Sequence, residues 1–269
     1  MRWLTGGCVL SLLLLAGLAS AAQEVRVASV YFPPYVFKIE QTAPAPGLLA
    51  ELLEALNVQQ DAFHFVPVPT SIKRRFGDLR QGRIDLAIFE NPAWGWQGIA
   101  HKALDMGLED TEVFVARAEP GRGEEYFAQL QGKRLALYHG YHYAFADFNA
   151  EPGYLAKTFN ATLTHSHDSN LLMVLHKRAE IALVTRSYID DFIARNPEFA
   201  GQLLISERID QRYRHHVLLR PGAPISAEQF AALLEQLRSN GQLLKIFGRY
   251  QIAVLPPAAD SSATAATQH

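Results

Sequence analysis

Cysteine is almost absent from this sequence: Cys8 is the only one among 269 residues. It lies in an N-terminal segment that combines a basic Arg2, an apolar run over Val9–Leu18 and the small residues Ala19–Ala21. These are the parts of a cleavable secretory signal peptide, so we expect residues 1–21 to be removed. The mature chain would then fold in the periplasm, an oxidising compartment, without any disulfide to stabilise it.

Long apolar runs and an excess of basic charge are missing as well. No later segment approaches the roughly 20 apolar residues that span a bilayer. The 25 basic residues fall to 24 once Arg2 is removed, against 27 acidic residues, which argues against a nucleic-acid partner. No glycine-rich phosphate loop, nucleophile elbow or His-Glu-x-x-His motif occurs. The 10 histidines lack cysteine partners and carboxylates at a settled spacing, so we expect neither a metal nor a cofactor.

Strand-like and helix-like runs alternate in the first part of the chain. Strands are predicted over Val25–Tyr31, Phe63–Val68 and Ile84–Phe89, with helices over Leu48–Leu56 and Ser71–Arg80 between them. This order is typical of a parallel sheet with helical crossovers, and therefore of an α/β fold. The third run carries a single charge, so we expect a strand that is buried on both faces.

A second α/β series follows the proline- and glycine-rich stretch 118–123. Strand-like runs at Glu112–Arg117 and His216–Arg220 bracket it and could both be crossovers between two units. The expected strands of this series are Arg134–Tyr138, Ala161–Thr164 and Ile181–Val184, and its expected helices are Tyr126–Leu130, Leu155–Phe159, Leu171–His176 with Asp168 or Ser169 as N-cap, and Tyr188–Arg195.

Two further helices are predicted near the end of the chain, Ala227–Leu237 and Leu243–Tyr250. If they pack back on the first unit, the chain forms two lobes joined by two strands, with a ligand cleft between the lobes. Residues 22–117 plus 218–256 would form lobe 1, and residues 118–217 would form lobe 2. The Ala/Ser/Thr-rich tail 257–269 is expected to be disordered.

The order and spacing of several short motifs resemble those of the bacterial extracellular solute-binding proteins of family 3, the amino-acid-binding type. The resemblance covers residues 24–252 and implies a type 2 periplasmic-binding (Venus flytrap) fold with two hinge strands. It also implies a monomer that captures a small molecule for an ABC permease or a membrane sensor. The matching pieces are Tyr31-Phe32-Pro33-Pro34-Tyr35, Gly47-Leu48-Leu49-Ala50-Glu51-Leu52, Gly82-Arg83-Ile84-Asp85, Leu130-Gln131-Gly132-Lys133-Arg134-Leu135-Ala136, and Asn240-Gly241-Gln242-Leu243-Leu244-Lys245-Ile246 with Tyr250.

Two departures from the family pattern put a standard α-amino-acid ligand in doubt. Family members usually carry Thr-x-x-Arg after the third strand, whose arginine holds the ligand carboxylate, but residues 91–96 contain no arginine. They also often carry an aspartate for the ligand's amino group where this chain has Thr185 and Arg186. Arg74 matches an arginine of more divergent members and could supply the missing charge, whereas Asp85 is expected to be structural.

Except for Arg74, which lies in the predicted helix Ser71–Arg80, the candidate binding residues lie at or after the ends of strands, because ligands of open α/β sheets bind at the carboxyl ends of strands. Each has a simpler alternative role: the tyrosines in a packed turn, a tryptophan in the core, Glu90 as an ion-pair partner of Arg74 or Arg75, and residues 138–143 as a surface turn. Since Trp94 and Trp96 alternate around Gly95, one alone could reach the cleft. The candidates are Tyr31, Tyr35, Arg74, Glu90, Trp94, Trp96, His139, Tyr141 and Arg186.

The function that these patterns favour is capture of a small polar ligand, amino-acid-like or another metabolite, for an ABC importer. An enzyme of the dehydratase or lyase type on the same fold is one alternative, with Glu90 or a histidine as general acid or base. A soluble sensory module for a membrane receptor is another. No residue is assigned a catalytic role under the favoured function.

Overall fold

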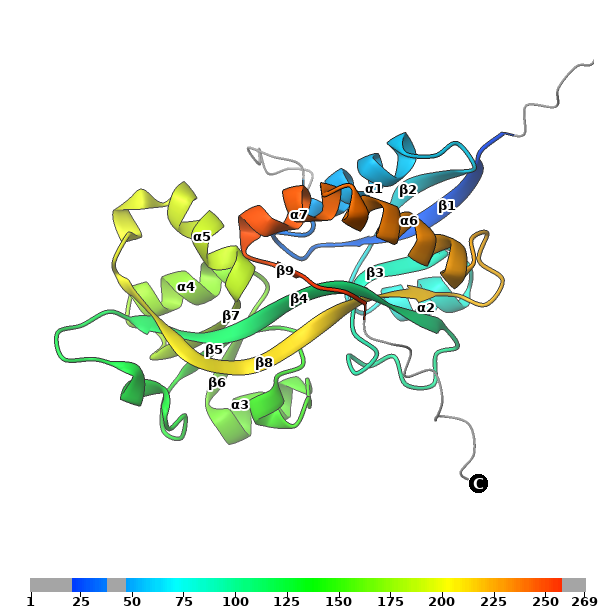
Figure 1. Ribbon diagram of the computed structural model, residues 1–269. Helices are drawn as coiled ribbons and strands as arrows, with labels where there is room; N and C mark the ends of the chain where they lie inside the picture. Colours follow the sequence, from blue (N-terminus) through cyan, green and yellow to red (C-terminus); the bar gives the residue numbers. More distant parts are fainter. Residues whose placement is uncertain (1–20, 38–46, 258–269) are drawn as a thin grey trace, which may run out of the picture.

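The computed structural model describes residues 21–37 and 47–257, which form two lobes connected by two long strands (Figure 1). Residues 1–20 of the expected signal peptide and residues 258–269 of the expected tail lie outside the described residues. Within the described ranges, no helix has the length and apolar character needed to cross a membrane.

Lobe 1 is built on three parallel strands, β1 (Gln23–Val30), β2 (Phe63–Thr70) and β3 (Leu86–Glu90), in the order β2-β1-β3. Helices α1 (Leu48–Val58) and α2 (Arg75–Arg80) connect them, so the predicted β-α-β-α-β order is confirmed. Every residue of β3 is buried, as its sequence predicts. β2 is the outer strand, which explains how it tolerates two prolines that cannot donate to a ladder.

Two long antiparallel strands, β4 (Lys102–Arg117) and β8 (Leu203–Leu219), run through both lobes (Figure 1). At one end β8 pairs with β3 of lobe 1, and at the other end β4 pairs with β7 (Ile181–Thr185) of lobe 2. The two expected crossovers are therefore confirmed, although both strands begin far earlier than predicted. The limits at residues 117/118 and 217/218 stay a prediction, because both strands belong to both lobes.

Lobe 2 holds the parallel strands β5 (Leu135–Tyr138), β6 (Ala161–Thr164) and β7. The predicted helix at Tyr126–Leu130 is wrong, since this part contains a 3-10 turn at Glu124–Phe127. Further 3-10 turns lie at Ala144–Ala146 and Pro197–Phe199, and the helices of the lobe are α3 (Pro152–Phe159), α4 (His167–Leu175) and α5 (Arg186–Arg195).

The predicted N-cap of α4 is corrected by the structure. Ser166 caps the helix, with its Oγ accepting a hydrogen bond from the Ser169 N–H at 3.1 Å. Asp168 lies inside the first turn and accepts hydrogen bonds from the Tyr188 hydroxyl and the Arg195 guanidinium. Ser, Asp and similar residues all make good caps, so the sequence alone does not decide between neighbours.

The C-terminal segment returns to lobe 1, as expected. Helices α6 (Ala227–Ser239) and α7 (Gln242–Phe247) pack on α1 and contribute to one continuous apolar core. A 3-10 turn at Gly248–Tyr250 and the short β9 (Ala253–Val254) follow, and β9 pairs with β4. The apolar core of lobe 2 is separate and covers both faces of its strands.

Asp85, expected to be structural, is completely buried just before β3. Its two oxygens accept hydrogen bonds from the Arg26 backbone N–H and from the guanidinium groups of Arg26 and Arg220, all at 2.7–2.9 Å. One carboxylate, at the amino end of β3, thus joins β1, β3 and the end of β8, whereas the cleft residues lie at the opposite, carboxyl ends of β1 and β3.

Gly107 marks an irregularity in β4 that a side chain would disturb. Its φ is +64°, and a Cβ at this position would overlap the Leu255 carbonyl oxygen and the Arg238 guanidinium. Gly107→Ala should therefore lower the free energy of unfolding by about 2–4 kcal/mol, from the left-handed backbone and the clash together. Gly121→Ala is the matched control, because its φ is +76° and no atom lies within 4 Å. Equal losses in urea unfolding would contradict this account.

Candidate functional site

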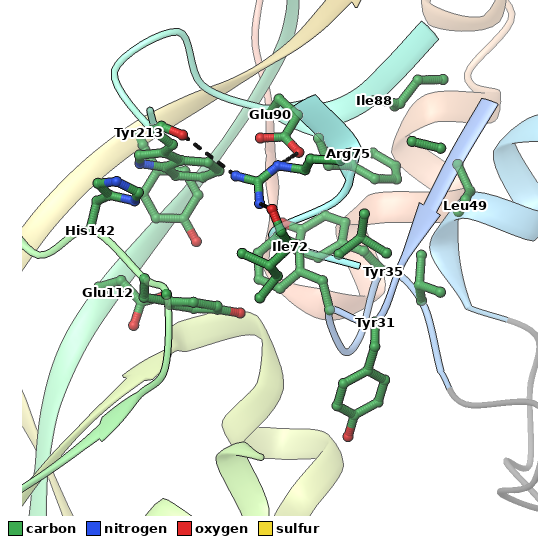
Figure 2. A pocket seen from close by; sticks show the side chains of 18 of the residues that line it. Tyr31, Tyr35, Leu49, Ile72, Arg75, Ile88, Glu90, Glu112, His142 and Tyr213 are labelled. Carbon is green, nitrogen blue, oxygen red and sulfur yellow. Dashed lines mark hydrogen bonds and ion pairs between the residues drawn. The ribbon is translucent and has the colours of Figure 1, made fainter. Parts of the chain in front are cut away.

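A cleft of about 700 Å³, part of it open to solvent, lies between the two lobes (Figure 2). It is lined from lobe 1, from both hinge strands and from the loop after β5 in lobe 2. A molecule in this cleft would therefore contact every part that could move. The lining residues are Ala28, Val30, Tyr31, Phe32, Tyr35, Val36, Leu49, Ile72, Arg75, Ile88, Phe89, Glu90, Trp94, Glu112, Gly140, Tyr141, His142, Gln211 and Tyr213.

Aromatic rings that follow β1 form one wall. The proline-containing turn between Phe32 and Val36 stacks Phe32 on Tyr35 with ring centroids 4.7 Å apart. Phe32 also meets Tyr141 of lobe 2 edge to face at 5.7 Å, so the two lobes touch here. Tyr31 lines the cleft beside them. Aromatic walls of this kind are typical of sites for ligands with an apolar or flat body.

Tyr35 lines the cleft with its ring while its hydroxyl is bound within the protein. The hydroxyl donates to Asp110 Oδ2 at 2.7 Å and lies 2.6 Å from His215 Nε2. Ser187, in the first turn of α5, donates to the same Asp110 oxygen at 2.6 Å. Burial raises the pKa of Asp110, although these hydrogen bonds oppose the rise. The cluster joins lobe 1, both hinge strands and lobe 2.

The charged centre of the cleft is an ion pair between Arg75 and Glu90, 2.7 Å from Nε to Oε1 (Figure 2). Both side chains are at least nine-tenths buried. Arg74, the predicted cleft arginine, is exposed and does not line the cleft. The reason is local: residues 72–74 form a turn, so α2 begins at Arg75 and that side chain is directed toward the end of β3.

Every nitrogen of the Arg75 guanidinium faces a protein acceptor. Besides the contact with Glu90, Nη1 donates to the Ile72 carbonyl, and Nη2 is 3.5 Å from the Trp94 carbonyl. The guanidinium also lies over the Phe76 ring, 4.4 Å from its centroid. This arginine is thus already engaged and presents no free fork to a ligand carboxylate.

Glu90 is held by the irregular end of β3. Phe89 has a φ of +62°, and the pairing with β8 shifts register between Ala87 and Glu90. This bend places Glu90 where Oε1 meets Arg75 and Oε2 accepts a 2.9 Å hydrogen bond from Trp96 Nε1. Burial raises the pKa of Glu90, and the Arg75 charge and the Trp96 hydrogen bond oppose that rise.

The two tryptophans divide as their alternation around Gly95 suggests. Trp94 lines the cleft and meets the Tyr213 ring edge to face at 5.0 Å. Trp96 is 1% exposed, lies behind Glu90 against Phe76 and is not among the lining residues. Its part in the site is to hold Glu90 in place.

The hinge strands supply lining residues that the sequence did not single out. Glu112 of β4 accepts a 2.5 Å hydrogen bond from Thr185 of β7, whose hydroxyl lies 3.2 Å from His167 Nε2. Tyr141, a predicted site residue, lines the cleft with its hydroxyl 3.3 Å from the same nitrogen. Burial lowers the pKa of His167 to about 3, so its ring is neutral at pH 7.

His139 and Arg186 lie outside the cleft lining, unlike Tyr31, Tyr35, Glu90, Trp94 and Tyr141. The His139 ring is 4.9 Å from that of His165. Arg186 opens α5 and pairs with Asp190 at 3.6 Å. Among the described residues, no group of three His, Cys, Asp or Glu side chains is placed to hold a metal ion. The lining residues that were not candidates include Arg75, Glu112, His142 and Tyr213. Arg75 was signalled by its place in the basic run and His142 by the His-rich loop 138–143, whereas Glu112 and Tyr213 carried no distinct signal.

No protein-family model and no curated protein matches this sequence. Solved structures do match. A histidine kinase sensor domain with similarity to periplasmic binding proteins is 20% identical, with a TM-score of 0.64 over 88% of this chain and 99% of that chain. The probable amino-acid ABC transporter extracellular-binding protein from Bacillus subtilis is 12% identical, with a TM-score of 0.65 over 85% and 98%.

An ancestral arginine-binding protein bound to arginine is also similar, at 17% identity and a TM-score of 0.63 over 84% of this chain and 97% of that chain. At such identities the likeness concerns the fold alone. It agrees with the resemblance drawn from the sequence motifs and with the two hinge strands. This chain therefore has the two-lobed α/β fold of the periplasmic binding proteins.

Proposed function

We propose that this protein captures a small molecule in the cleft between its lobes and presents the closed, liganded form to a membrane partner. The observation that carries the proposal is that both lobes and both hinge strands line one cleft. A ligand that contacts both lobes favours the closed state in proportion to its extra contacts there. Periplasmic location belongs to the proposal and rests on the signal-peptide pattern of residues 1–21.

The proposed partner is an ABC importer, with a membrane sensor as the alternative. Both kinds of protein occur among the similar structures, as the transporter-binding protein from Bacillus subtilis and the histidine kinase sensor domain. The sensor domain is covered over 99% of its length, which supports keeping this alternative.

An enzyme on the same fold is less well supported by the geometry. Glu90 would be the acid or base, but its two oxygens are bound to Arg75 and Trp96. A general base must reach the proton that it abstracts, and this carboxylate has no oxygen free to do so. His142 lines the cleft, but burial lowers its pKa and no carboxylate of the described part of the chain pairs with it.

A thermal-shift screen of amino acids, polyamines, organic acids and sugars tests ligand capture. A ligand at 100 times its Kd stabilises the folded state by about 2.7 kcal/mol, enough to raise Tm by several degrees. Trp94→Ala should reduce the shift, because it removes a cleft wall. Phe148→Ala is the control, since Phe148 is an exposed aromatic outside the cleft.

The recovered ligand distinguishes binding from catalysis. A compound that shifts Tm and is recovered unchanged after prolonged incubation supports the binding function. Consumption of that compound by the protein would instead favour the enzyme. A Tm shift that Trp94→Ala leaves intact would place the ligand outside the cleft and contradict the proposal.

A further inference from the structure

An unpaired carboxylate oxygen lies in the wall of the cleft. Glu112 is 1% exposed and lines the cleft on a different side from Glu90 (Figure 2). Its Oε1 accepts the hydrogen bond from Thr185, whereas Oε2 is buried without a hydrogen-bond partner among the described residues. A buried polar atom without a partner is costly, so a donor on a bound molecule would relieve that cost.

Aromatic rings surround this carboxylate. Burial is the larger cause of the raised pKa values of Tyr141 and Tyr213. Both hydroxyls also lie close enough to Glu112 for its charge to raise these pKa values further. The Tyr213 hydroxyl lies near Glu112 but without hydrogen-bond geometry, and the Trp94 ring packs edge to face on Tyr213. Aromatic faces attract cations, most strongly where water is excluded.

The charge balance of the lining also favours a cation. Among the described residues that line the cleft, Arg75 is the one arginine or lysine, and Glu90 neutralises it. Within residues 21–37 and 47–257, no basic side chain is in ion-pair contact with Glu112. A ligand carboxylate would meet no free cation in the lining, whereas a ligand ammonium group would meet a carboxylate and three rings.

We infer that Glu112, Tyr141, Tyr213 and Trp94 form a subsite for the cationic amine of a ligand that carries an apolar or aromatic body and no carboxylate. This inference rests on the proposed function, because it names the ligand class of the same cleft. The amine donates to Glu112 Oε2, and the body lies along Tyr31 and Phe32 of lobe 1.

Binding at this subsite is coupled to a proton. Burial raises the pKa of Glu112 well above its usual range, so the ligand-free carboxyl keeps its proton to a higher pH than a free glutamate does, and an incoming cation displaces that proton. Affinity should therefore rise with pH below that pKa and level off above it. The facing groups are Asp110 on β4, Thr185 on β7, His167 on α4, Tyr141 and Tyr143 after β5, and Asp210 and Tyr213 on β8.

Of these groups, His167 stays neutral above its lowered pKa of about 3, and the tyrosines stay neutral because burial raises their pKa values. Asp110 and Asp210 also have raised pKa values through burial, so they can titrate in the same range. A Glu112→Gln variant separates the contribution of Glu112 to the pH dependence of affinity from that of Asp110 and Asp210, because it keeps both aspartates.

Isothermal titration calorimetry with two matched pairs of probes tests the subsite. The pairs are phenethylamine with 3-phenylpropionate and hexylamine with heptanoate, which differ within each pair only in the charged group. We expect each amine to bind at least about tenfold more tightly than its acid, the range of a charge-assisted hydrogen bond. Glu112→Gln should remove most of that preference, whereas Glu109→Gln, on the same strand but outside the lining, should not.

Proton release is measured on the unaltered protein, so the test does not depend on how the variant folds. Titration of phenethylamine in phosphate and in HEPES, repeated from pH 5 to pH 8, should give apparent enthalpies that differ between the buffers over part of that range, because a proton passes to the buffer. Acids that bind as tightly as the amines, or an amine preference that survives Glu112→Gln, would overturn the inference. If the acids bind and Trp94→Ala abolishes their binding, the proposal that the cleft captures a small molecule is retained, although the amine subsite is refuted. Failure of both pairs and of the wider screen would refute the proposed function too.

Discussion

Arg75→Ala is expected to lower the free energy of unfolding by about 3–5 kcal/mol, because it leaves the Glu90 carboxylate buried without its cation. Arg74→Ala, one residue earlier and exposed, should change stability by no more than about 0.5 kcal/mol. Urea unfolding at pH 7 measures the free energy of unfolding of both variants, provided that the dependence of this free energy on urea concentration is the same in each. Similar losses for the two neighbours would show that the ion pair does not stabilise the fold.

The double variant Arg75→Ala/Glu90→Gln refines this result. Removing the charge of Glu90 should recover part of the loss, since most of it comes from an uncompensated buried charge. The deficit of Arg75→Ala should also narrow as the pH falls. Burial already raises the pKa of Glu90, and losing Arg75 raises it further, so the folded variant takes up a proton before the unfolded chain does.

Asp85→Asn should cost about 3 kcal/mol at pH 7. It removes the shared counterion of Arg26 and Arg220, and the estimate is kept at the lower end because both arginines are partly exposed. Burial alone would raise the pKa of Asp85, but hydrogen bonds from the two arginines outweigh it and hold the pKa below its usual range. The carboxylate therefore stabilises the fold above the unfolded-state pKa of about 3.9.

This stabilisation disappears as the pH falls below about 4 and through the lower folded-state pKa. Thermal unfolding of the natural protein and Asp85→Asn between pH 7 and pH 2.5 should show two curves that converge in acid. Asp61→Asn, at an exposed position, should follow the natural protein throughout. A deficit for Asp85→Asn that is independent of pH would mean that shape, not charge, is responsible.

Local periodicity was enough to predict the parallel part of lobe 1. β3 could be read from one nearly uncharged run, because strands covered on both faces must be apolar throughout. The cleft position followed from the rule that ligands meet the carboxyl ends of strands, which placed Tyr31, Tyr35, Glu90 and Trp94 in its lining. These inferences needed only sequence order and strand direction.

The hinge strands could not be recognised in full from the sequence. The first half of β4 carries Lys102, Asp105 and Glu109, and the middle of β8 is rich in charged residues, so neither part has the apolar pattern of a buried strand. Their backbone groups pair mainly with each other, and that pairing depends little on side chains. Tyr213 lies in the unrecognised part of β8, and Glu112 opens the predicted run Glu112–Arg117, whose pattern does not show that this carboxylate faces the cleft. The proposed subsite for a cation therefore had no sequence signal.

The choice between Arg74 and Arg75 shows a second limit. Each residue added to a helix turns the side chain by about 100°, so an error of one residue at the start moves a guanidinium to another face. Residues 72–74 form a turn, not the predicted first turn of the helix. Besides the nearby Ile72 carbonyl, the acceptors that hold Arg75 come from β3 and the following loop, which are distant in sequence.

The pairing of β4 with β8 has a mechanical consequence. Two unpaired connecting segments could change conformation independently of each other. Because β4 and β8 are hydrogen-bonded to each other as one ribbon, they must bend and twist together. The ladder of this ribbon is irregular between Asp105 and Leu108 and between Glu112 and Val115, and such irregularities bend a strand and increase its local twist. The second one begins at Glu112, so the proposed amine subsite would lie where the ribbon bends.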